Sequence, residues 1–154
     1  LGTQRCLELL HFNVLLDIKD ILGQNNGSPD KTIAVWDKML RDGLIPDVSV
    51  QASAWYDFTA LMFQSRWGTK EGMEWLLTRD PPANPDIQTI GGNTALMKAV
   101  TRNNPAKVRL LLDHKADRSI KDKDGYTPLS IAIKYNKDPA IIELVENYYP
   151  GNNR

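Results

Sequence analysis

The pattern of apolar and polar positions repeats three times along the second two thirds of the chain. Its most visible mark is a four-residue motif: Thr59-Ala60-Leu61-Met62 returns as Thr94-Ala95-Leu96-Met97 and as Thr127-Pro128-Leu129-Ser130, at separations of 35 and 33 residues. Later apolar positions keep the same register, seventeen residues after each threonine, at Leu76, Leu111 and Leu144. A fixed period of this length indicates stacked copies of one structural unit that share a continuous core.

Each unit is predicted to contain two short amphipathic helices. In every copy an apolar stretch follows the threonine, then a polar break, then a second stretch whose apolar residues are spaced by three and four positions. The breaks contain start signals for the second helix, because Asn104-Pro105 and Asp138-Pro139 each place a side-chain oxygen before a proline, and Thr69 is a plainer cap. Polar linkers at 84–92 and 116–125 join the helical hairpins.

The residues of the last copies resemble a known family. The run from Asp122 to Ala132, Asp-Lys-Asp-Gly-Tyr-Thr-Pro-Leu-Ser-Ile-Ala, preceded by Leu110 to Asp117, is similar to the ankyrin repeat. The resemblance covers 84–146 and extends over 48–83, where Asp57 takes the usual glycine position; Asp tolerates the left-handed conformation better than most residues. It implies an all-α, ankyrin-type solenoid of helical hairpins with β-hairpin turns between the repeats.

One family position differs in all three copies. The histidine that is common after Thr-Pro-Leu in ankyrin repeats is absent, and Met62, Met97 and Ser130 stand in its place. Its usual hydrogen-bonding role must therefore be met by these residues or lost.

Residues 1–47 match the repeat poorly. Leu7 to Leu22 predicts one long amphipathic helix, and Ser28-Pro29 caps a second helix that contains Trp36 and Met39. We interpret 1–47 as a divergent N-terminal repeat or cap, since an end unit must bury one face and expose the other. The predicted order is this cap, ankyrin-like repeats at 48–83 and 84–117, a C-terminal capping repeat at 118–150, and a tail at 151–154.

The composition adds little chemistry to this picture. Nineteen basic and nineteen acidic residues give the 154-residue chain a net charge of zero. The chain therefore has no overall electrostatic field that would attract nucleic acid or anionic membranes. One cysteine, Cys6, and two histidines, His11 and His114, are too few for a zinc cluster or an internal disulfide. The histidines also belong to distant repeats, which do not meet in a stack. We expect no enzymatic activity, no cofactor and no metal.

Location and state follow from similar reasoning. No apolar run reaches the roughly 18 residues of a membrane span, and the leucine-rich start is interrupted by charges, unlike a signal peptide. We expect an intracellular, cytoplasmic protein that is monomeric in isolation and binds neither membranes nor nucleic acid. Because the chain begins at Leu1, we also expect it to be a piece of a longer protein.

Charge is balanced overall but not locally. From Lys98 to Lys123 there are eight Lys or Arg residues against three Asp, whereas residues 1–60 contain five against eight acidic residues. We expect the partner to be another protein. Because opposite charges steer association, we expect an acidic segment of that partner to lie over residues 98–123.

The resemblance also implies a binding surface, because partners of ankyrin-like stacks contact the hairpin tips and the ends of the first helices, which line a concave groove. By register, the candidate protein-binding residues are Trp55, Tyr56, Phe58, Arg66, Trp67, Ile90, Asn93, Arg102, Lys123, Tyr126, Lys134 and Tyr135. Trp, Tyr and Arg dominate interface hot spots. For Trp55 and Phe58, filling the seam between the first units is an equal alternative, whereas Trp67 is expected to be exposed.

The sequence therefore predicts a protein–protein interaction module, a scaffold or adaptor. One alternative is a substrate-recruiting or regulatory ankyrin domain of a larger enzyme. Another is an RNA-binding helical repeat, because residues 35–48 resemble the second helix and exit turn of a pentatricopeptide repeat. That pattern occurs once, and the zero net charge disfavours RNA binding.

Overall fold

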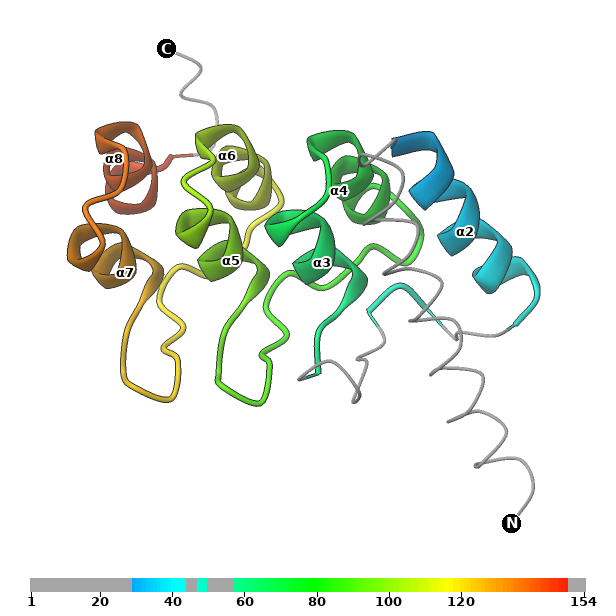
Figure 1. Ribbon diagram of the computed structural model, residues 1–154, viewed down its shortest axis with the longest axis horizontal. Helices are drawn as coiled ribbons and strands as arrows, with labels where there is room; N and C mark the ends of the chain where they lie inside the picture. Colours follow the sequence, from blue (N-terminus) through cyan, green and yellow to red (C-terminus); the bar gives the residue numbers. More distant parts are fainter. Residues whose placement is uncertain (1–28, 44–46, 50–56, 150–154) are drawn as a thin grey trace.

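The computed structural model describes residues 29–43, 47–49 and 57–149 (Figure 1). Within these ranges the chain forms α2 (Pro29–Arg41), α3 (Ala60–Arg66), α4 (Lys70–Leu77), α5 (Ala95–Thr101), α6 (Pro105–Asp113), α7 (Pro128–Lys134) and α8 (Pro139–Asn147), and no β-strand. The predicted second N-terminal helix corresponds to α2. The predicted helix from Leu7 to Leu22 lies outside the described residues.

The helices of the three repeats form two parallel rows (Figure 1). Helices α3, α5 and α7 form the inner row, from which the inter-repeat hairpins extend, and α4, α6 and α8 form the outer row. Each helix packs on its partner within the repeat and on its neighbours along the row. The all-α helical-repeat fold predicted from the sequence is therefore confirmed.

The helices begin at the residues that the sequence indicates. In the outer row the side chains of Thr69, Asn104 and Asp138 accept hydrogen bonds from backbone N–H groups of the first turn. In the inner row the three recurring threonines, Thr59, Thr94 and Thr127, do the same. Because each such cap stabilises a helix by about 1 kcal/mol, these residues fix where short helices start.

Two of the residues at the family's histidine position supply its missing hydrogen bond. The sulfur of Met62 accepts a hydrogen bond from the Thr59 N–H at 3.5 Å, and Ser130 Oγ accepts one from the Thr127 N–H at 2.8 Å. Each completes a reciprocal capping box at the start of its helix. A thioether sulfur and a hydroxyl oxygen thus both accept the hydrogen bond of the N-cap backbone N–H, in different repeats.

The repeats are joined by tight hairpins. In the two described in full, Thr89 N donates to Asn93 O and Asp122 N donates to Tyr126 O, both at 2.9 Å. The backbone is left-handed at the same position of all three repeats, with φ of +59° at Asp57, +79° at Gly92 and +82° at Gly125. The expectation that Asp57 takes the glycine conformation is confirmed.

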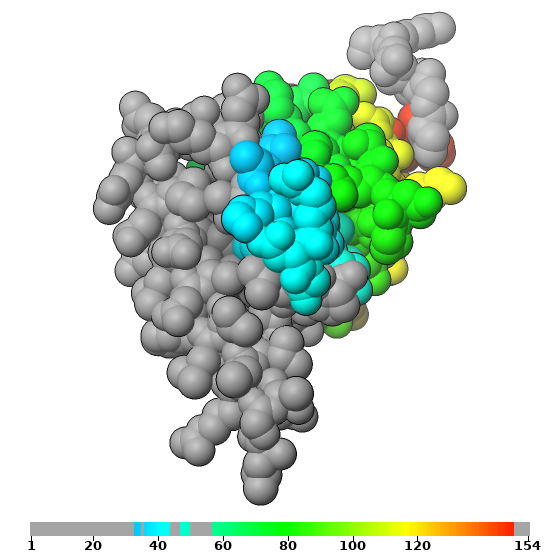
Figure 2. All heavy atoms as spheres, turned by 90° about the vertical axis from the view of Figure 1, so that its right-hand side faces the viewer, coloured from blue at the N-terminus to red at the C-terminus, as the bar shows by residue number. Residues whose placement is uncertain are grey.

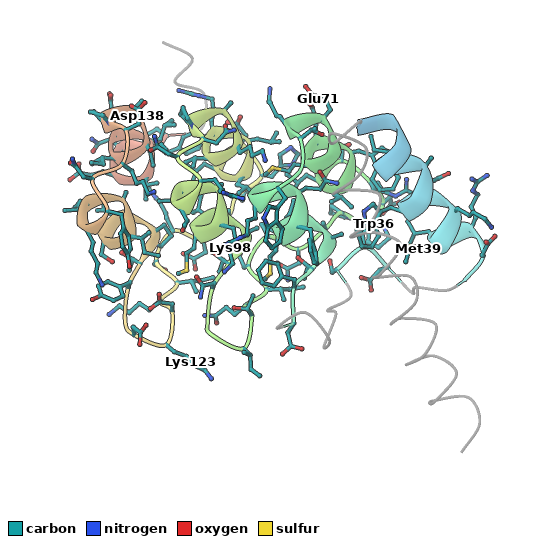
Figure 3. All side chains as sticks on the ribbon, viewed as in Figure 1. Trp36, Met39, Glu71, Lys98, Lys123 and Asp138 are labelled. Carbon is teal, nitrogen blue, oxygen red and sulfur yellow. The ribbon has the colours of Figure 1, made fainter. Side chains whose placement is uncertain are left out.

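A continuous apolar core runs between the two rows. The residues that keep the repeat register, from Met73 in α4 to Val145 in α8, are buried, with Leu144 partly so. Trp36 and Met39 of α2 extend this core at the N-terminal end, where α2 packs on α4 (Figures 2 and 3). Apolar burial at roughly 25 cal/mol per Å² is therefore the main term that holds the stack together.

Candidate protein-binding surface

The structure places most of the predicted contact residues on one side of the stack. Trp55 and Tyr56 lie outside the described residues. The others belong to the inner row or its hairpins: Phe58, Arg66 and Trp67 around α3; Ile90, Asn93, Lys123 and Tyr126 in hairpins; Arg102 after α5; and Lys134 and Tyr135 at the end of α7. They do not form one uniform strip. Seven of them gather in two aromatic clusters and a cationic region, whereas three belong to none of these groups: Ile90, Asn93 and Lys123.

The first aromatic cluster consists of Phe58, Phe63 and Trp67. Its ring centroids are 5.3 Å apart for Phe58 and Phe63, 5.8 Å for Phe58 and Trp67, and 5.3 Å for Phe63 and Trp67. Trp67 is 45% exposed, as the sequence predicted, and the Arg66 guanidinium lies 4.8 Å from its ring centroid. Aromatic pairs at such separations stabilise each other beyond their buried area, so Trp67 is held in place while one side of it faces solvent.

The prediction for Phe58 as a contact residue needs correction. Its side chain is only 8% exposed, because Trp67 and Phe63 cover it. Phe58 therefore supports the exposed tryptophan from below and offers little surface of its own.

The second aromatic cluster consists of Tyr126, Lys134 and Tyr135 in the last repeat. Lys134 Nζ donates a hydrogen bond to the Tyr126 hydroxyl at 2.8 Å and lies 4.0 Å from the Tyr126 ring centroid. It also lies 5.4 Å from the ring of Tyr135, which is 59% exposed. The hydrogen bond to Tyr126 raises the pKa of Lys134, so this lysine is a fixed positive charge between two rings.

A cationic region lies between the two clusters, where α5 adjoins α3. Lys98 Nζ is 4.9 Å from the Phe58 ring centroid, and Figure 3 places this residue on the inner row. Arg102 Nε donates to the Arg66 carbonyl at 2.8 Å, which ties the two arginines together across the repeats. Burial, and then the positive charge of Arg66, lower the pKa of Lys98. We call Arg66, Lys98 and Arg102 the cationic seam.

Two members of this surface were missed by sequence reasoning. Phe63, which is buried, and Lys98, which is partly buried, each stand four residues after the first threonine of their repeat. The repeat register could have found both, because it aligns position four of each copy. They were overlooked because only hairpin tips and helix ends were considered.

Acidic residues are absent from the inner row. The sequences of α3, α5 and α7 contain Arg66, Lys98 and Lys134 but no Asp or Glu, whereas α2 and all three outer helices contain carboxylates. In Figure 3 Glu71 and Asp138 lie at the edge of the molecule opposite the hairpin tip that carries Lys123. The two rows therefore present different electrostatic surfaces.

The positive excess predicted over 98–123 does not form a single patch. Lys107 is 7% exposed, and its Nζ donates to three carbonyl oxygens around the end of α3 at 2.7 to 3.3 Å. Arg118 donates to the carbonyls of Val145 and Glu146 in the last turn of α8. Both cations satisfy free carbonyls at helix ends. Arg102 Nε also donates to a helix-end carbonyl, that of Arg66, whereas Lys98 lies against the Phe58 ring on the inner row.

The opposite side of the stack also contains a cleft. A cleft of about 580 Å³ lies along the outer row and is lined by residues of α4, α6 and α8, among them Arg109, Asp113 and Tyr148. The Tyr148 hydroxyl donates a hydrogen bond to Asp113 Oδ1 within it. Its lining mixes both charges and includes none of the predicted contact residues.

Two features are missing from the residues that the structure describes. No helix there has the length and apolar character needed to cross a membrane. Those residues also contain no group of three His, Cys, Asp or Glu side chains suited to a metal ion.

The sequence is similar to proteins that contain the same repeat. An ankyrin repeat protein of fowlpox virus (strain NVSL) is 36% identical over 102 residues, which are 66% of this chain and 30% of that protein. An ankyrin repeat-containing protein of Treponema pallidum (strain Nichols) is 34% identical over 88 residues, which are 57% of this chain and 28% of that protein. The poly(ADP-ribose) polymerase tankyrase of Caenorhabditis elegans is 29% identical over 65 residues, which are 42% of this chain and 3% of the polymerase. The matched segments therefore span less than a third of each relative.

The family itself is identified by a match that covers most of the chain. The profile for ankyrin repeats, in three copies, matches residues 61–153. This range contains the three helical hairpins, the capping threonines of the second and third repeats, and both fully described hairpin loops. The chain belongs to the ankyrin-repeat family.

Proposed function

We propose that this chain is a protein–protein interaction module, a scaffold or adaptor, that holds a segment of a partner protein across its inner row. The observation that carries the proposal is the pair of aromatic clusters, each with an exposed aromatic side chain, Trp67 and Tyr135, on a rigid helical support. Rigid aromatic residues bury large areas at little cost in side-chain entropy. Ankyrin repeats are generally interaction modules, which agrees with this use.

The proposal assigns binding and not catalysis to the chain. It places the interaction inside the cell, in the cytoplasm, in line with the use of a single cysteine. We expect the acidic segment of the partner to contact the cationic seam instead of the whole region 98–123. The reason is that Lys107 and Arg118, which belong to that region, donate to carbonyls at helix ends.

The test compares three single substitutions of exposed aromatic residues. The purified chain and the variants Trp67→Ala, Tyr135→Ala and Tyr149→Ala are immobilised, and the proteins captured from lysate are quantified by mass spectrometry. Tyr149 is the control, because it is an aromatic residue at least as exposed as the other two but lies after α8. A partner of the inner row is lost with the first two variants and kept with the third.

Affinity and stability are then measured with the captured partner. Each inner-row substitution should cost about 2 kcal/mol of binding or more, as hot-spot residues do, while the melting temperature stays nearly unchanged. If Trp67→Ala instead unfolds the chain and leaves affinity intact, the tryptophan is a core residue and the proposal fails. Loss of binding only in Tyr149→Ala would move the site to the outer row.

A second candidate is a substrate-recruiting or regulatory ankyrin domain within a larger enzyme. It is favoured by the similarity to a segment of the polymerase tankyrase of C. elegans and by the greater length of all three relatives. The inner row would then bind the substrate of a catalytic part of the same polypeptide. Sequencing the complete open reading frame would decide between a recruiting domain and a free adaptor.

A further inference from the structure

Three cations from two repeats meet at the cationic seam. Lys98 Nζ lies 4.9 Å from the Phe58 ring, and the Arg66 guanidinium lies 4.8 Å from the ring of Trp67, which stacks on Phe58. Arg102 Nε is bonded to the Arg66 backbone carbonyl, so the three residues lie around the same pair of rings. The inner helices that surround them contain no carboxylate. Like charges gathered without a counter-charge raise the energy of the free protein.

Other buried or bridging cations in the described part of the chain have oxygen partners. Lys107 Nζ is surrounded by three carbonyl oxygens, Arg118 is bonded to two, and Arg79 lies 3.4 Å from an Asp37 carboxylate oxygen. Within the cationic seam Arg102 follows this rule, because its Nε donates to the Arg66 carbonyl, but Arg66 and Lys98 depart from it. Arg66 Nε is buried and has no hydrogen-bond acceptor among the described residues, and Lys98 contacts the face of Phe58.

Aromatic rings satisfy these charges only in part. The face of a ring attracts a cation, but it offers no lone pair for the buried Arg66 N–H. A carboxylate supplies both the negative charge and the acceptor oxygens, and its hydrogen bonds to guanidinium groups are among the stronger ones in proteins. The seam is therefore complementary to a carboxylate that arrives from outside.

We propose that the cationic seam binds an Asp or Glu side chain of an acidic partner segment, next to an apolar residue of that segment that packs on Trp67. This inference rests on the proposed function, because it assigns the partner class of the same inner row. A protein segment fits better than RNA because the cations without oxygen partners are concentrated at the cationic seam and do not continue along the inner row. Further along the row, Lys134 is bonded to Tyr126 and lies near the charge of Asp124. The described inner helices therefore offer a phosphate backbone no continuous row of free cations.

The test uses a phage-displayed library of short random peptides selected on the intact chain. The expected result is a set of binders enriched in Asp or Glu beside an aromatic or aliphatic residue. For a selected peptide, Lys98→Gln and Arg66→Gln should each weaken binding by about tenfold or more, as removal of a close charge partner does. Lys70→Gln and Arg109→Gln, on the outer row, are matched charge controls and should change affinity little.

The variants and two further arms separate the possible failures. Binders that lack acidic residues but are lost in Trp67→Ala would overturn the carboxylate site and leave the proposed interaction surface intact. The absence of any binder that Trp67→Ala abolishes would reject peptide binding on the inner row, and with it both proposals. Replacing the acidic residue of the selected peptide by Gln should match the loss seen in Lys98→Gln. Tighter binding of a labelled oligouridylate than of the acidic peptide, abolished by the same seam variants, would overturn the choice of a protein partner.

Discussion

The seam between the first and second repeats handles its positive charges differently from the seam between the second and third. In the first, Lys107 is buried and donates to three carbonyls around the end of α3. In the second, Lys137 performs a similar bridge from a more exposed position, with one bond to the Thr101 carbonyl at 2.8 Å. The apolar register is the same in both seams, so apolar packing sets the geometry of stacking. The hydrogen bonds that lysines make across the seams differ between the two.

The second seam is also connected at the level of the hairpins. Lys123 N donates to Gly91 O at 3.1 Å, and Gln88 Nε2 donates to Lys121 O at 3.0 Å. Adjacent hairpins therefore lie against each other with little room between their backbones. This contact distributes the stability of the second seam over both helices and loops.

The largest expected effect comes from the core that the two seams share. Leu111 is fully buried in the middle repeat, whereas Leu144 holds the same register position in the last repeat and is only partly buried. Leu111→Ala should cost about 2–5 kcal/mol of unfolding free energy, since it leaves a cavity. Leu144→Ala should cost clearly less. Urea titration checks both, and equal losses would show that burial along the stack is uniform.

The next effect separates the bridging lysines. Lys107→Met keeps the aliphatic stem but leaves buried carbonyls without their donor, so we expect a loss of about 1–3 kcal/mol. Lys137→Met removes an exposed bridge and should cost under about 0.5 kcal/mol, as most surface changes do. Chemical denaturation of both variants measures the difference. A more stable Lys107→Met protein would mean that burying the ammonium costs more than its hydrogen bonds return.

The hairpin contact is tested with two glycines that share a left-handed backbone. A β-carbon at Gly92 would lie 2.8 Å from the Lys123 nitrogen, whereas one at Gly125 would meet nothing within 4 Å. Gly125→Ala should therefore show only the backbone penalty, of order 1 kcal/mol, and Gly92→Ala should lose more. Thermal unfolding of the pair isolates the loop contact, and matching losses would argue that the hairpins separate freely.

The smallest expected effect concerns Lys98. Its folded-state pKa lies below the ordinary lysine value of 10.5, because of burial and the charge of Arg66. Between these two pKa values the unfolded chain binds more protons, so stability rises with pH in that window. Lys98→Met should flatten this rise and leave the protein at least as stable at neutral pH. Urea titrations at several pH values compare the two proteins, and the shared contribution of Lys107 cancels in the difference.

Much of the fold was predictable because it depends on short stretches of sequence. The N-caps at Thr69, Asn104 and Asp138 follow from residues within four positions. The left-handed Asp57 follows from its place at the glycine position of the ankyrin repeat. The exposure of Trp67 was also anticipated. Phe63 and Lys98 were within reach of the register but were not identified.

The part that sequence reasoning could not supply is the pairing of polar groups between repeats. Lys107 was counted as a free positive charge, yet its partners lie 39 to 43 residues earlier in the chain, at a helix end. The repeat register aligns apolar positions, which recur, but these polar residues do not recur from copy to copy.

The sequence by itself determined the repeating helical hairpins, their starting residues and their buried positions, because periodicity and capping act between near neighbours. The tertiary structure alone decided which cations donate hydrogen bonds to carbonyls at helix ends and which lie at the cationic seam. The physical reason is that an ion's environment depends on the dielectric and on the oxygens around it, and both are set by the packing of one repeat on the next.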